Sequence, residues 1–306
     1  MRIGINGTGL VRHASIDRIV QDASHAQKNG FSSYWLAEHP TGGFDALSAL
    51  LVTGTQVPTI ELGTAIIPTW PRHPMALAGQ AQTTHDGIGH RLTLGIGLSH
   101  ESMMAELGIG FDKPIGHLKD YLSILVALLE TGQVDYQGRY LSTTARAFQT
   151  PQKSCPVLVA ALGPQALAVA GRLAQGTSLA WVGPKTVREH IKPRISEAAA
   201  AAGKVAPRIV ATLPICVTDD ETRVREHISK TLSMYAQLPS YKAMFEREGV
   251  STPGELGLVG SEQKVRDSLA QLAEAGVTDY AASQYVTNPQ EADATHALLV
   301  GVAQSA

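Results

Sequence analysis

The pattern of hydrophobic positions in this chain alternates between short apolar runs and longer amphipathic segments. Ile60–Pro68 is an apolar run with many β-branched residues, which is typical of a strand buried on both faces. Pro71 and Pro74 end this strand because proline lacks an N–H, and Met75–His85 then predicts a helix. Leu92–Gly97 is the next buried strand. A strand, a helix and a strand at this spacing indicate a crossover between parallel strands.

The same alternation continues along the whole chain. Further strands are predicted at Arg2–Asn6, Phe31–Leu36, Pro156–Ala161, Thr177–Val182, Arg208–Val217 and around Gly276–Tyr280. Eight strand–helix units favour an α/β fold, a closed (β/α)8 TIM barrel formed by residues 1–306 as a single domain. Insertions are expected after strand four, as a loop at 101–115 and a hairpin at 133–141, and after strand seven, at 219–260. An open doubly wound sheet is the weaker alternative, because no GxGxxG motif follows the first strand.

Composition narrows the class of protein. With 306 residues, 44% of them hydrophobic and 17% charged, the chain is able to bury a large core. A net charge of -2 gives no basic surface for nucleic acid or an anionic membrane. Cys155 and Cys216 have no metal-ligand spacing, so neither a metal site nor a disulfide framework is expected. No apolar stretch approaches the roughly 18 residues of a membrane span and no signal-peptide pattern opens the chain, which predicts a soluble, cytoplasmic protein.

Polar residues follow several predicted strands at their carboxyl ends, where parallel sheets carry their chemistry. Glu38 and His39 follow strand two, and a carboxylate beside an imidazole is suited to proton transfer near neutral pH. The alternative is a capping carboxylate and a surface histidine. His100 follows Gly97 and Ser99 after strand four, and a structural role is its alternative. The helical histidines are assigned to solvent or packing; they are His85, His117 and His190.

The segment Ala161–Pro164 ends strand five and opens a helix. Pro164 suits the first helical position, Gly163 lets the backbone approach a ligand closely, and the free amides beyond it suit an anion such as a phosphate. Thr177 and Ser178 would offer hydroxyls to the same phosphate if the barrel closes. A plain helix start and two strand hydroxyls are the alternative.

Several blocks of sequence, taken in order, resemble the luciferase-like monooxygenase superfamily of flavin- and deazaflavin-dependent TIM-barrel oxidoreductases. The blocks are Gly30–Trp35 with Glu38-His39, Gly63–Ile66, Arg72–Pro74, Arg91–Gly97, Ala160–Pro164 and Ala170–Gly176. Within the superfamily, Gly95–His100 and Leu238–Tyr241 are most similar to a subfamily assigned to coenzyme F420, a deazaflavin. The chain departs from the family pattern at Glu38, His90 and Gln175.

The resemblance implies a cofactor site at the end of the barrel. It implies a cis peptide between Ala65 and Ile66, against which the middle ring of the deazaflavin lies, and a phosphate at Leu162, Gly163 and Pro164. His39 would face the reactive carbon. The residues expected at the cofactor are Thr64, Ala65, Ile66, Gly97, Ser99, Ala161, Leu162, Gly163, Pro164, Thr177 and Ser178.

These expectations predict an oxidoreductase that moves a hydride between coenzyme F420 and a small organic substrate. His39 is the expected acid or base, helped by Glu38, while His100 and Trp70 line the substrate side. The resemblance also suggests a homodimer. The first alternative is an FMN-dependent monooxygenase on the same fold, and the second is a non-catalytic barrel that binds a flavin or a metabolite.

Overall fold

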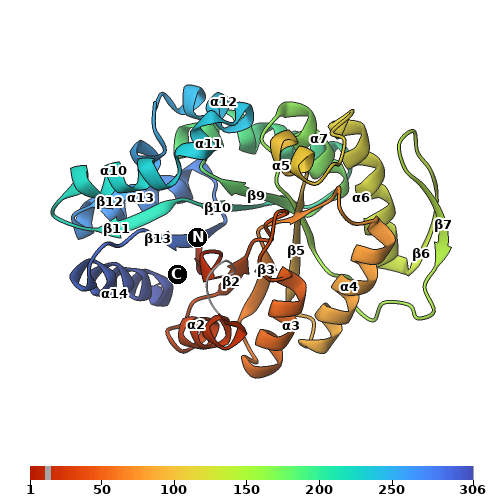
Figure 1. Ribbon diagram of the computed structural model, residues 1–306, viewed down its shortest axis with the longest axis horizontal. Coiled ribbons are helices and arrows are strands. Elements are labelled where there is room, and N and C mark those ends of the chain that lie inside the picture. Colours follow the sequence, from red (N-terminus) through yellow and green to blue (C-terminus); the bar gives the residue numbers. More distant parts are fainter. Residues whose placement is uncertain (11–14, 306) are drawn as a thin grey trace.

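The computed structural model describes residues 1–10 and 15–305, and its main sheet closes into a barrel of parallel strands (Figure 1). The strands of the barrel follow one another in the order β1, β2, β3, β5, β8, β9, β10 and β13, and β13 pairs back with β1. Their bounds are β1 Arg2–Asn6, β2 Ser33–Leu36, β3 Glu61–Thr64, β5 Leu92–Gly97, β8 Val157–Val159, β9 Gly176–Ala180, β10 Arg208–Thr212 and β13 Asp279–Gln284. This closure confirms the predicted TIM barrel, and the open-sheet alternative is wrong.

Helices surround the barrel and begin where the sequence provides caps. Ser15 and Ser261 accept backbone hydrogen bonds at the starts of α2 and α13, as Asp45 does for α3. The outer helices are α2 Ile16–Lys28, α3 Ala46–Gln56, α4 Pro74–Gly87, α6 Pro114–Thr131, α7 Pro164–Leu173, α10 Glu221–Thr231, α13 Glu262–Ala275 and α14 Pro289–Ser305. One further helical run comprises α8 Pro184–Thr186, the π-helical turn η1 Val187–Ile191, and α9 Lys192–Ala201.

Two runs predicted as single strands are each divided in the structure. Ile60–Pro68 forms β3 and then β4 (Ile67–Pro68), and both pair with β5. Arg208–Val217 forms β10 inside the barrel and then β11 (Pro214–Val217), which pairs with β12 (Leu258–Gly260) outside it. The apolar pattern is the same on both sides of each break, because it reports burial and carries no information about the partner strand.

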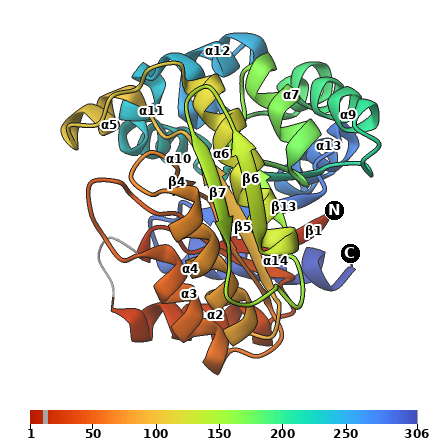
Figure 2. The same cartoon turned by 90° about the vertical axis from the view of Figure 1, so that its right-hand side faces the viewer.

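Three groups of elements lie between the barrel units. Helix α5 (Glu101–Glu106) lies where a loop was predicted, and the hairpin of β6 (Gln133–Gln137) and β7 (Ser142–Arg146) runs along α6. After β11 come α11 (Ser233–Gln237), α12 (Pro239–Glu248) and the short η2 (Pro253–Leu256). Figure 2 shows α5 and α11 on one side of the molecule and the two chain ends on the other. Since α5 directly follows β5, its side is that of the carboxyl ends of the strands.

The inside of the barrel is filled by one large ring and smaller side chains. Trp35 packs there with Leu158, Val210 and Ala281, which come from other strands around the barrel. A Cβ atom on Gly63 would lie 2.2 Å from the Trp35 ring, so a glycine is required beside it. Within residues 1–10 and 15–305, every helix is too short or too polar to cross a membrane.

Candidate active site

The residues singled out from the sequence gather at the carboxyl ends of four neighbouring strands. Strands β2, β3, β5 and β8 follow one another around the barrel. His39 follows β2, Ala65 and Ile66 follow β3, His100 follows β5, and Gly163 follows β8. Because the strands are parallel, these segments share one edge of the barrel.

Glu38 anchors the loop that carries His39. Its Oε2 accepts a hydrogen bond from Arg72 Nη1 at 3.0 Å and one from the Ala46 N–H at 3.3 Å. Arg72 also pairs with Asp45, the capping residue of α3. Burial raises the pKa of Glu38 and Asp45 acts in the same direction, while Arg72 opposes the shift. The carboxylate therefore ties the β2 loop to α3 and holds the loop that contains His39 in place.

The segment after β3 is fixed by hydrogen bonds on both sides. The peptide between Ala65 and Ile66 is cis, as the resemblance implied. The Ala65 N–H donates to the Leu36 carbonyl at 2.7 Å, and the Ile66 carbonyl accepts from the Glu38 N–H at 3.0 Å. The hydroxyl of Thr64 donates to the Gly95 carbonyl and accepts from the Gly95 N–H, so it is already engaged within the barrel wall.

The end of β5 packs against the helices above the barrel. Ser99 has a positive φ of 59°, which turns the chain sharply after Gly97. The His100 ring that comes next lies 5.5 Å from the ring of Tyr241 on α12, and burial lowers the pKa of His100. Tyr241 in turn contacts Tyr235 on α11, whose ring lies 5.6 Å from Trp181 after β9. Trp181 and Tyr235 were not singled out from the sequence, and Tyr241 entered only as the last residue of the block Leu238–Tyr241.

A second aromatic group lies after β4. The Trp70 ring stacks on the His117 ring of α6 with centroids 3.7 Å apart, and Phe111 lies 5.3 Å from Trp70. His117 is buried and its Nε2 lies 3.1 Å from the hydroxyl of Thr69, which agrees with its assignment to packing. Burial lowers the pKa of His117 to about 4, so this ring is neutral at pH 7. Trp70 thus has a rigid support on one face.

The start of α7 is open to a ligand. Gly163 is the capping residue, and no side chain accepts hydrogen bonds from the first amides of this helix. A Cβ atom built on Gly163 would meet no other atom within 4 Å. Ala161 is fully buried below it, whereas Gly163 is exposed. The free amides of a helix start favour an anion, so this position fits the predicted phosphate.

The prediction that the Thr177 hydroxyl contacts the phosphate does not agree with the structure. Its hydroxyl is fully buried and donates to the Val159 carbonyl at 2.7 Å, so it has no proton left for a phosphate. Ser178 is the register partner of Val210 and therefore shares the inner face of the barrel with it. The hydroxyl of Ser178 is buried, and its contact with a cofactor stays a prediction.

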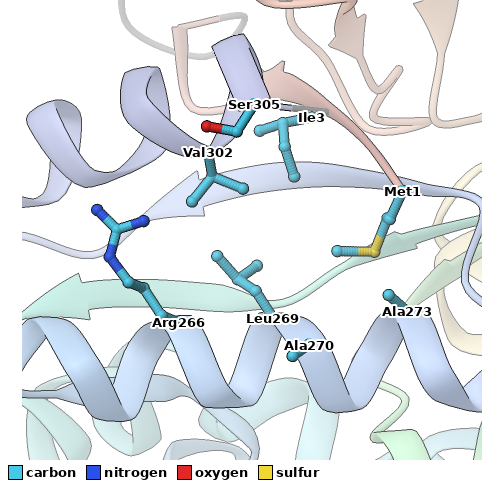
Figure 3. Close-up of a pocket in the computed structure, with 8 residues that line it drawn as sticks. All are labelled: Met1, Ile3, Arg266, Leu269, Ala270, Ala273, Val302 and Ser305. Carbon is cyan, nitrogen blue, oxygen red and sulfur yellow. The ribbon is translucent and has the colours of Figure 1, made fainter.

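A groove on the surface lies away from this edge. Figure 3 shows it between α13, α14 and the first residues of β1, lined mainly by apolar side chains and with a volume of about 270 Å³. Its lining includes Met1, Ile3, Leu269 and Val302. It lies beside the amino end of β1, whereas ligands of parallel barrels bind at the carboxyl ends.

Comparisons with known proteins agree with this architecture. A reductase of Methanopyrus kandleri, named 5,10-methylenetetrahydromethanopterin reductase, is 24% identical in an alignment that covers 83% of this chain and 84% of the relative. A protein of Nakamurella multipartita named F420-dependent glucose-6-phosphate dehydrogenase is 24% identical, over 80% of this chain and 75% of the relative. The solved structure of an F420-dependent secondary alcohol dehydrogenase with an F420–acetone adduct has the same fold, with a TM-score of 0.82 at 16% identity over 99% and 98% of the two chains. The model of the luciferase-like monooxygenase family matches residues 3–279, and the chain therefore belongs to this family.

Proposed function

We propose that this chain is an F420-dependent oxidoreductase that transfers a hydride between the deazaflavin and a small organic substrate. The observation that carries the proposal is the shared barrel edge, with His39 at one end of it and the open start of α7 at the other. Relatives named for F420-dependent activities, similar over most of the chain, support the choice of cofactor.

The residues at this edge fit the cofactor. The first amides of α7 would hold its phosphate, and Gly163 leaves the space that a side chain would fill. The segment Ala65–Ile66, fixed between Leu36 and Glu38, would support the ring system. When bound, the deazaflavin supplies the hydride chemistry, and the protein supplies orientation and protons.

His39 is the group proposed to hold or move the proton of the substrate. Pro40 comes directly after it and restricts its backbone to extended conformations, while Glu38 keeps the loop attached to Arg72. In this arrangement Glu38 is a positioning residue, because its carboxylate already accepts hydrogen bonds from Arg72 and Ala46.

The substrate would lie between two aromatic walls. Trp70, stacked on His117, would form one of them, and His100 with Tyr241 would form the other. Helices α11 and α12 carry Tyr235 and Tyr241 and would exclude water from the reacting atoms.

An equilibrium titration of the purified protein with F420 and with FMN tests the proposal. We expect F420 to bind with a dissociation constant in the micromolar range or below, and FMN about tenfold more weakly or worse. Tight FMN binding with oxygen-dependent turnover would favour the FMN-dependent monooxygenase instead. Binding without turnover of any deazaflavin-coupled substrate would favour the non-catalytic barrel.

A further inference from the structure

A buried histidine contacts the open start of α7 from inside the protein. His190 lies in the π-helical turn η1, is 2% exposed, and places its Nε2 2.7 Å from the Leu162 carbonyl oxygen. A carbonyl oxygen only accepts hydrogen bonds, so Nε2 carries the proton. The other ring nitrogen, Nδ1, is buried and has no partner within the described residues.

This hydrogen bond fixes the direction of the next amide. In a trans peptide the C=O and the following N–H lie in one plane and point in opposite directions. Because the Leu162 carbonyl points toward His190, the N–H of Gly163 points away from it. Within the described chain no backbone or side-chain acceptor lies against this N–H.

We propose that His190 is a positioning residue for the cofactor phosphate. It holds the Leu162–Gly163 peptide so that the Gly163 N–H and the first amides of α7 face the same anion. The inference rests on the proposed function, since it assigns a role within that cofactor site.

Among the described residues, the bond from His190 is the one hydrogen bond that holds the Leu162–Gly163 peptide. Gly163 has no side chain, and no atom lies within 4 Å of where its Cβ would be. Glycine adopts more backbone conformations than other residues, so rotation of the peptide before it meets little resistance. The imidazole, packed in the interior, removes that freedom.

The surroundings of His190 keep its imidazole neutral, with the proton on Nε2. Burial lowers its pKa, and the nearby cations Arg247 and Arg194 act in the same direction, against the effect of the bond to Leu162. A neutral imidazole has one N–H, and the bond to Leu162 uses it. A proton on Nδ1 would be a buried donor with no acceptor, which is unfavourable.

The test compares two ligands on three variants of His190. The ligands are F420 and the same deazaflavin with its ribityl chain but without the phosphate, each titrated by fluorescence. In His190→Leu we expect F420 to bind about tenfold more weakly, which corresponds to about 1.4 kcal/mol, while affinity for the phosphate-free ligand stays nearly unchanged. His190→Gln should restore F420 affinity, because its amide nitrogen is able to take the place of Nε2. His190→Asn has the same chemistry but is too short to reach Leu162, and should behave like the leucine variant.

A matched control is His85→Leu. His85 is also a buried helical histidine, but it lies in α4 close to the start of β5, at the other end of the barrel. It should leave the affinities for both ligands unchanged.

Equal losses for the two ligands in His190→Leu would mean a general structural role and would overturn the inference. His190→Asn binding F420 as well as His190→Gln does would also overturn the inference. If His190→Leu does not fold, the comparison of the glutamine and asparagine variants tests the inference by itself. If the wild-type protein does not bind F420, the proposed function itself is wrong, and the role of His190 is lost with it.

Discussion

Replacing Gly163 with valine tests the anion site at the start of α7 with little effect on packing. The Cβ of the new residue would meet no atom within 4 Å, so the branched side chain would extend into open space. The backbone of Gly163, with φ -77° and ψ 155°, is in the extended region that valine favours. The side chain would stand where the phosphate is proposed to bind.

The expected effects on stability and on binding differ in size. Valine is a poorer helix cap than glycine, which costs about 1 kcal/mol. The lower entropy of the unfolded chain returns about 0.4–1 kcal/mol, so the net change is within about 1 kcal/mol. Loss of one hydrogen bond to a charged phosphate costs about 1.5–3 kcal/mol, which weakens cofactor binding roughly ten- to a hundredfold.

Chemical denaturation and a fluorescence titration with F420 measure the two effects separately. Gly79→Val is the matched control, because a Cβ at Gly79 in α4 also meets no atom within 4 Å, and α6 packs between α4 and α7. The control should bind F420 like the wild type. A Gly163→Val variant that does the same would refute the placement of the phosphate at α7.

Three further predictions concern the proton donor, the cofactor and the stability of the fold. His39→Ala should slow single-turnover hydride transfer about a hundredfold or more while cofactor affinity changes only a few-fold, and Glu38→Gln should slow it less. If His39→Ala turns over normally and His100→Ala is inactive, His100 is the acid or base instead. Absorbance of the reconstituted protein should show F420 retained through gel filtration and FMN lost, and the reverse result would contradict the cofactor assignment. Burial acts to raise the pKa of Glu291, but hydrogen bonds from Thr287 and Arg223 hold it at about 2. Glu291 therefore stabilises the fold fully above about pH 4.5 and loses this effect as the pH falls toward 2. Glu291→Gln should unfold at a lower temperature than the wild type at pH 7, and this difference should shrink steadily as the pH falls from about 4.5 toward 2.

The barrel was predictable because its signals are local. Helix α13 spans Glu262–Ala275, since Ser261 caps its start and Gly276 ends it, and both signals are visible in the sequence. The divisions of Ile60–Pro68 and Arg208–Val217 were not predictable in the same way. Arg208–Val217 divides where the chain leaves β9 for β12, a partner distant in sequence. Ile60–Pro68 divides at Ala65–Ile66 although both of its parts pair with β5, and the apolar pattern does not mark that break.

The candidate site was only partly predictable for a related reason. Strand-end positions are set by the order of elements, and this order placed His39, His100 and Gly163 at one edge. The direction of a side chain within a strand depends on which face turns inward. Alternation separates Thr177 from Ser178 but does not say which of them faces the inside of the barrel, and the structure gives that place to Ser178.

His190 illustrates a further limit of sequence reasoning. A histidine in a helical segment is common, and the sequence alone assigns this one to solvent or packing. The π-helical turn adds a residue to the helix and so rotates the turn before it by about 100° relative to the turns after it. With that rotation, Ile195 and Ala199 of α9 face the core while the buried ring of His190 reaches the Leu162 carbonyl. A single 3.6-residue period applied to both η1 and α9 would assign the wrong buried face to one of them. The contact between η1 and the start of α7 is therefore visible only in the three-dimensional structure.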